Sequence, residues 1–116
     1  MGQLNNLEER SLNFAKRVGL FVKTLSKHPA NMEYAKQVIR SSGSVGANYI
    51  EANEALSKKD FVMRIKICRK ESKESYYWLR LITETNPDEF QKEGMELINE
   101  AIELKKIFSA ILIKSK

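Results

Sequence analysis

In the first quarter of the chain, residues at alternating spacings of three and four are mostly large and apolar. This spacing places side chains on one stripe of an α-helix. Asn5 or Asn6, each followed three residues later by a glutamate, has the capping-box pattern and predicts the start of this helix. Pro29 pushes His28 out of helical geometry and predicts its end. The predicted stripe consists of Leu4, Leu7, Ser11, Phe14, Val18, Phe21 and Leu25.

A second amphipathic segment runs from about Asn31, its expected N-cap, to about Leu56. Its middle is rich in very small residues, and each glycine among them costs a helix about 1 kcal/mol relative to alanine. We expect another backbone to approach closely there, or else a kink in the helix. The small residues are Ser42, Gly43, Gly46 and Ala47. The inward stripe is predicted to be Met32, Ala35, Ile39, Ser42, Gly46, Tyr49 and Asn53.

Two further helices complete the pattern. Ser57 and Asp60 have capping-box spacing and predict the start of a third helix, which ends near Thr85. Asn86 and Pro87 then supply an N-cap and a proline suited to the first position of a fourth helix. The third stripe is predicted to be Phe61, Ile65, Cys68, Ser72 and Leu79. The fourth is predicted to be Phe90, Gly94, Leu97, Ala101, Leu104, Phe108 and Ile111.

Short polar breaks connect the four segments, and the sequence has no strand pattern, internal repeat or domain linker. Helices of about 20 to 27 residues are roughly 30 to 40 Å long. Connections this short force neighbouring helices to run antiparallel. Residues 1–116 are therefore predicted to form one domain, an all-α antiparallel up-down-up-down four-helix bundle.

Composition and charge place the chain among ordinary globular proteins. Of its 116 residues, 42% are hydrophobic and 30% are charged, and the net charge is +5. A basic protein favours anionic partners. Neither an apolar run long enough to cross a bilayer nor a signal peptide is evident, so no membrane association is expected. Because Cys68 is the only cysteine, no intrachain disulfide is possible, and the reducing cytoplasm is the expected compartment.

One face of the third helix is basic and lies opposite its core stripe. Lysines with a neighbouring tyrosine on one face are suited to contacting phosphates and stacking on a base. The alternative is a solvated lysine face that keeps an oligomer soluble. The residues of this face, which we call the lysine face, are Lys59, Lys66, Lys70, Lys73 and Tyr77.

Apolar residues outside the core stripe of the third helix indicate self-association. Ile67 and Trp78 lie roughly 100° from that stripe at 100° per residue, and Leu81 lies further round. Aromatic anchors are enriched in protein interfaces, so we expect these three residues to be buried against another subunit. A ragged edge of the core is the alternative.

Polar and catalytic candidates are few. Asn48 and Glu51 on the second helix are expected to pair with Arg69 or Ser72 of the third, or with a neighbouring subunit, in a network that fixes helix register. A di-iron bundle needs Glu-x-x-His pairs on two helices, whereas His28 is the only histidine and precedes a proline. Cys68 falls on a core stripe and is expected to be buried. The sequence predicts no catalytic residue, metal site, cofactor or small-molecule substrate.

Four segments carry a resemblance to a known family: QVIRSS at 37–42, SVGANYIEA at 44–52, SKKDF at 57–61 and KESKESYYWLRL at 70–81. They resemble the small bacterial four-helix-bundle proteins encoded by intervening sequences in 23S ribosomal RNA genes. The resemblance implies a ring-like homopentamer without enzymatic activity. It also implies kinship with the accessory proteins of diversity-generating retroelements, which are basic pentamers that engage a reverse transcriptase and nucleic acid. Ala52 stands where many members have glycine, so the second helix is expected to continue past it.

Two hypotheses follow for the function. The first is a non-enzymatic homopentameric bundle that binds ribosomal RNA, or a ribonucleoprotein, through the lysine face. The second is a structural assembly module whose partner is another protein, with lysines that serve only solubility.

Overall fold

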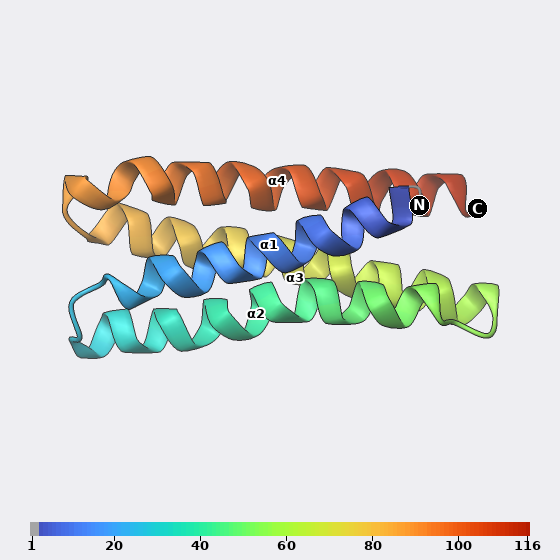
Figure 1. Cartoon of the computed structure of the whole chain (residues 1–116), viewed down its shortest axis with the longest axis horizontal. Coiled ribbons are helices and arrows are strands. Elements are labelled where there is room, and N and C mark those ends of the chain that lie inside the picture. Colours follow the sequence, from blue (N-terminus) through green and yellow to red (C-terminus); the bar gives the residue numbers. More distant parts are fainter. Residues whose placement is uncertain (1–2) are drawn as a thin grey trace.

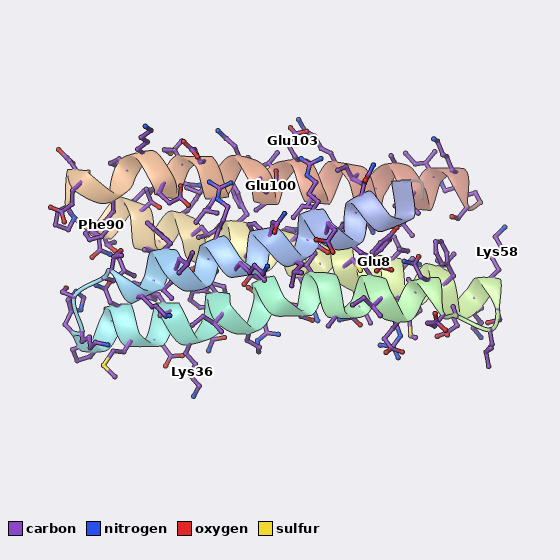
Figure 2. The ribbon with its side chains drawn as sticks, in the orientation of Figure 1. Glu8, Lys36, Lys58, Phe90, Glu100 and Glu103 are labelled. Atoms are coloured by element: carbon purple, nitrogen blue, oxygen red, sulfur yellow. The ribbon has the colours of Figure 1, made fainter. Side chains whose placement is uncertain are left out.

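Four long helices make up the computed structural model, which describes residues 3–116, with side chains from Asn6 onward. They are α1 (Gln3–Lys23), α2 (Pro29–Asn53), α3 (Lys58–Thr85) and α4 (Gln91–Lys114), and the short 3₁₀ helix η1 (Asp88–Phe90) precedes α4. The predicted all-α four-helix fold is confirmed. Each helix runs opposite to the one before, so both termini and the α2–α3 connection lie at the same end (Figure 1). We call this the basic end. Lys58 lies at this end and Phe90 at the other (Figure 2).

The core follows the predicted stripes closely in three of the four helices. In α1 and the turn after it, the predicted stripe is buried from Leu7 to Leu25, while the side chain of Leu4 lies outside the described residues. The stripes of α3 and α4 are also buried, with Phe61, Phe90 and Ile111 packed against their edges. Helix α3 packs most extensively, against α2 on one side and α4 on the other.

The predicted stripe of α2 is wrong in part, since Ser42 and Tyr49 are buried as predicted but other members are not. Met32 and Ile39 are 60% and 51% exposed. Ser41 and Ser42 are buried because their hydroxyls donate to carbonyls of their own helix, at Val38 and Ile39, which satisfies the polar groups without solvent. The buried side chains of α2 are Asn31, Val38, Ser41, Ser42, Val45, Tyr49 and Ala52.

Two predicted helix starts are also wrong. Asn5 and Asn6 lie within α1, so neither caps it. Helix α1 ends at Lys23, and α2 begins with Pro29 in its first turn and His28 as N-cap. The His28 Nδ1 accepts a hydrogen bond from the backbone N–H of Asn31 at 3.4 Å.

Asn31 and Asn86 are buried or half-buried and pair with each other instead of capping helix starts. Their side-chain amides exchange hydrogen bonds of 3.0 and 2.9 Å. Asn86 also donates to the Ile82 carbonyl in the last turn of α3. This pair ties the start of α2 to the end of α3, and Pro87 leads into η1 instead of α4. By contrast, the predicted Ser57 cap of α3 is confirmed, because Ser57 Oγ accepts from the Asp60 N–H at 3.0 Å.

Candidate nucleic-acid interface

The lysine face is held outward by the core stripe on the opposite side of α3. Ile65, Cys68 and Leu79 are completely buried, which fixes the rotation of the helix about its axis. All five residues of the lysine face are exposed, and Tyr77 retains 57% of its accessible surface. From residue 59 to residue 77 the face spans about 27 Å at the helical rise. It therefore presents four ammonium groups and one aromatic ring along one straight edge.

The lysines of this face form no ion pairs with acidic side chains of the described chain. In the part of the chain that the structure describes, every ion pair but one uses an arginine, and the exception joins Lys106 to Glu103. None of the four lysines on the lysine face takes part in an ion pair within residues 3–116. Positive charge therefore remains concentrated there, as binding to phosphates requires.

The arginines instead connect helices. Arg10 of α1 binds both carboxylate oxygens of Glu100 on α4, at 2.7 and 2.9 Å, and these bonds raise the pKa of Arg10. Figure 2 shows Glu100 on the side of α4 that faces α1. Arg17 of α1 binds Glu93 of α4 in the same way, about two helical turns further along. These pairs join α1 to α4, which pack less extensively than α1 with α2, α2 with α3 or α3 with α4.

A second arginine cluster joins α2 to α3. Arg40 lies 2.9 Å from Glu74 and 3.3 Å from Glu71, and hydrogen bonding to Glu71 is the main cause of the raised pKa of Arg40. Glu71 is only 6% exposed, and its Oε1 lacks an aligned hydrogen bond. Helical spacing in the sequence does not reveal this cluster, because it depends on how α2 and α3 are placed relative to each other. Glu71 and Glu74 are thereby occupied with Arg40 and not with the lysine face.

The positive surface extends onto α4, where the sequence analysis predicted no contribution. Lys73 borders the same hollow as Lys105 and Lys106 of α4. Lys66 and Arg69 border a second hollow, together with Lys116. The signal in the sequence is a last helical segment, 104–116, that contains lysines and no acidic residue.

The predicted pairing of Asn48 and Glu51 with Arg69 does not occur within the described chain, and pairing with a neighbouring subunit stays a prediction. Asn48 accepts a hydrogen bond from Arg64 at 3.0 Å and donates to the Ser44 carbonyl at 2.9 Å. Arg69 lies five residues from Arg64, which is about 140° round the helix, and so faces α4 instead of α2. Glu51 is exposed and has no side-chain bond within the described chain.

The predicted interface residues are half-buried within a single chain. Trp78 packs on Tyr34 of α2, with ring centroids 6.2 Å apart, and meets Tyr77 edge-on at 5.2 Å. Intrachain packing therefore accounts for much of its burial, and Ile67 and Leu81 are also half-buried. Large apolar side chains that are more exposed than these three lie on α1 and α2: Leu12, Leu20, Met32, Ile39 and Ile50.

The small residues of α2 separate into two groups. A Cβ built on Gly46 would lie 3.0 Å from Ser11 Oγ on α1, so close helix approach occurs at this glycine. Ser42 is also buried. Gly43 has no heavy atom within 4 Å of such a Cβ, and Ala47 is exposed, so neither makes the expected close contact within the chain.

Groups suited to catalysis are sparse. Burial raises the pKa of Cys68 to about 12, and its thiol donates to the Val45 carbonyl at 3.4 Å. Within residues 3–116, no group of three or more His, Cys, Asp or Glu side chains has the arrangement of a metal site. No described helix is long and apolar enough to cross a membrane.

Comparison with known proteins identifies a family and a similar solved structure. The family model described as "23S rRNA-intervening sequence protein" matches residues 5–110. The chain is also similar to the crystal structure of a protein of unknown function from the S23 ribosomal protein family of Bacteroides thetaiotaomicron. The two are 32% identical, with a TM-score of 0.82, over 96% of this chain and 98% of the other. The comparison with curated proteins gave no match.

Proposed function

The chain belongs to the 23S rRNA-intervening sequence protein family, and from this premise we propose that it is a non-enzymatic homo-oligomer that binds RNA through the lysine face. Ribosomal RNA, alone or in a ribonucleoprotein, is the proposed target, and the cytoplasm the proposed compartment. The observation that carries the proposal is the set of four exposed lysines on α3 that no described carboxylate neutralises.

The expected mode of binding is electrostatic. Each phosphate contacted by a lysine releases condensed counterions, so affinity falls steeply as salt concentration rises. Four contacts to single-stranded RNA give a slope of log K against log salt of about −3 per subunit. Tyr77, exposed beside Lys73 and Lys70, adds a ring on which a base can stack.

We propose a homopentamer as the assembled form. Five copies multiply the charge of the lysine face, and several weak contacts then combine into a useful affinity. Ile67, Trp78 and Leu81 are one proposed contact surface, and the exposed Ile39 and Ile50 of α2 offer another. Mass measurement by light scattering, on the wild type and on Trp78→Ala and Ile39→Glu, tests which surface is used. An unchanged mass removes the corresponding surface from the interface.

Fluorescence anisotropy with a labelled ribosomal RNA fragment tests the RNA proposal. The variant Lys66→Glu/Lys70→Glu is expected to weaken binding at least tenfold. The control Lys16→Glu/Lys23→Glu makes the same change in net charge at exposed positions of α1, and should weaken binding much less. Equal losses in both variants would mean that only net charge matters, and no binding at low salt would reject the proposal.

The second candidate function is a protein-assembly module whose lysines serve solubility. The observation that favours it is the exposed apolar set on α1 and α2, which exceeds what a monomer in solution needs. Absence of RNA binding together with a stable oligomer is the result that would select it.

A further inference from the structure

A groove runs between α3 and α4 at the basic end of the bundle. Two hollows, of 550 and 370 Å³, share Ser109 and Ile113 and are therefore adjacent. We call the combined feature the α3–α4 groove. Its walls on α3 are Val62, Lys66, Arg69, Lys73 and Tyr76. Its walls on α4 are Ala101, Ile102, Lys105, Lys106, Ser109, Ala110, Leu112, Ile113, Ser115 and Lys116.

The floor of the groove is aliphatic. Ile102 and Leu112 are half-buried there, and Ile113 is 67% exposed. An apolar group that binds against an isoleucine this exposed removes apolar surface from water, which favours binding. The floor is thus suited to receiving apolar side chains from another molecule.

The rim of the groove is uniformly basic. Lys66, Arg69 and Lys73 line one side, and Lys105 and Lys106 line the other. No acidic residue lines either hollow, and among these five cations the structure pairs only Lys106, with Glu103 at 3.7 Å. A complementary partner must therefore carry carboxylates on both sides of an apolar stripe.

The length of the groove matches a helix. The α4 segment from 101 to 116 extends about 22 Å, which is about four helical turns. Amphipathic helices bind in grooves of this kind through apolar anchors at helical spacing. Single-stranded RNA fits the floor less well, because bases stack on aromatic rings. The one aromatic ring in the lining, Tyr76, lies under the Arg80 guanidinium at 5.9 Å.

We propose that the α3–α4 groove is the docking site for an acidic amphipathic helix of a partner protein. The partner's leucine-like anchors cover Ile102 and Ile113, and its carboxylates meet the lysines of the two rims. The site stands apart from the RNA proposal, since Ile102, Ile113 and Lys105 do not belong to the lysine face. Lys66 and Lys73 are common to both surfaces, so a bound helix would compete with RNA.

The probe for this site is a labelled synthetic helix of about 16 residues, with leucines at i, i+4, i+7 and i+11 and glutamates on both flanks. A scrambled peptide of the same composition lacks the apolar stripe. Anisotropy is expected to show binding of the amphipathic peptide at least tenfold tighter than that of the scrambled one. Equal binding of the two peptides, or no binding of either, would overturn the proposal.

Two variants locate the binding. Ile113→Glu places a carboxylate on the groove floor and is expected to weaken peptide binding at least tenfold. Leu20→Glu changes a similarly exposed residue, 63% against 67%, on α1, and should leave the affinity unchanged. Neither variant is expected to unfold the protein, because both side chains are mostly in solvent. Equal effects of the two would place the peptide elsewhere and overturn the proposal.

A third variant separates this proposal from RNA binding. Lys59→Glu/Lys70→Glu alters the lysine face without touching the groove lining, so it should lose RNA and retain the peptide. If the wild-type protein binds the peptide but does not bind RNA, only the RNA proposal is rejected. If Ile113→Glu abolishes RNA binding and the wild-type protein does not bind the peptide, the groove is a nucleic-acid site and the inference is overturned.

Discussion

Replacing Gly94 with alanine tests how closely α3 and α4 pack. A Cβ built on Gly94 would lie 2.8 Å from Thr83 Cγ2 and 3.0 Å from Thr83 Cβ, well inside van der Waals contact. Thr83 is 1% exposed and β-branched, so its side chain has little freedom to turn away. The added methyl group must therefore push the helices apart or distort Thr83.

The magnitude follows from two opposing effects. Overpacking of a buried site costs about 1 to 3 kcal/mol, and the short contacts here place Gly94→Ala at the upper end. Alanine regains about 1 kcal/mol in helix propensity. The net loss of unfolding free energy is about 2 kcal/mol, which corresponds to a fall in Tm of about 8 °C for a chain of this size.

Thermal unfolding followed by circular dichroism, at matched protein concentration, provides the assay. Gly19→Ala is the control, since no heavy atom lies within 4 Å of its added Cβ, and it should raise the stability by up to about 1 kcal/mol. The double variant Gly94→Ala/Thr83→Ala should recover part of the loss, because the hydroxyl and methyl groups that clash are gone. If Gly94→Ala and Gly19→Ala shift Tm equally, the reasoning about helix approach is refuted.

Three further predictions follow from buried or paired groups. The Cys68 thiol should react with a thiol reagent at pH 8 only as fast as the chain unfolds. Because the pKa of Cys68 is raised in the folded state, the thiol of the unfolded chain ionises at a lower pH than that of the folded chain. The free energy of unfolding should therefore fall by about 1.4 kcal/mol per pH unit between about pH 9 and 12. Cys68→Ala should reduce this slope. Asn31→Ala should cost about 1 to 3 kcal/mol in urea unfolding, because Asn86 loses its buried partner; no change would mean that the pair is dispensable. Arg10→Ala should cost about 0.5 to 1 kcal/mol at low salt and less at high salt, and a loss independent of salt would contradict an ionic contribution.

The fold was predictable because apolar periodicity identified three helix stripes directly. Phe14, Ile65 and Leu104 all lie where the spacing placed them, completely buried or nearly so. Apolar periodicity did not predict the buried side of α2 correctly, because that side is built partly from serines. A serine that bonds to its own helix is buried at little cost, and hydrophobicity alone does not distinguish it from a solvated one. Ile39 was therefore chosen over Val38, although Ser42 and Tyr49 of the predicted stripe are buried.

The candidate site was predictable only in part. The lysine face follows from helical spacing alone, and its exposure agrees with the structure. Pairing between helices does not follow from spacing, because it depends on the relative register of two elements. Arg64 and Arg69 are equally basic in the sequence, and only the α2–α3 register selects Arg64 as the partner of Asn48. The α3–α4 groove likewise requires two helices to be placed side by side.

Crosslinking tests the central claim, RNA binding by the lysine face, most directly. The protein is bound to ribosomal RNA containing a photoreactive uridine, irradiated, digested and mapped by mass spectrometry. Crosslinks are predicted in α3 between residues 59 and 77, with Tyr77 among the labelled positions, and they should decline as salt is raised. Crosslinks that fall mainly on α1 or α2, while α3 remains unlabelled, would contradict the account.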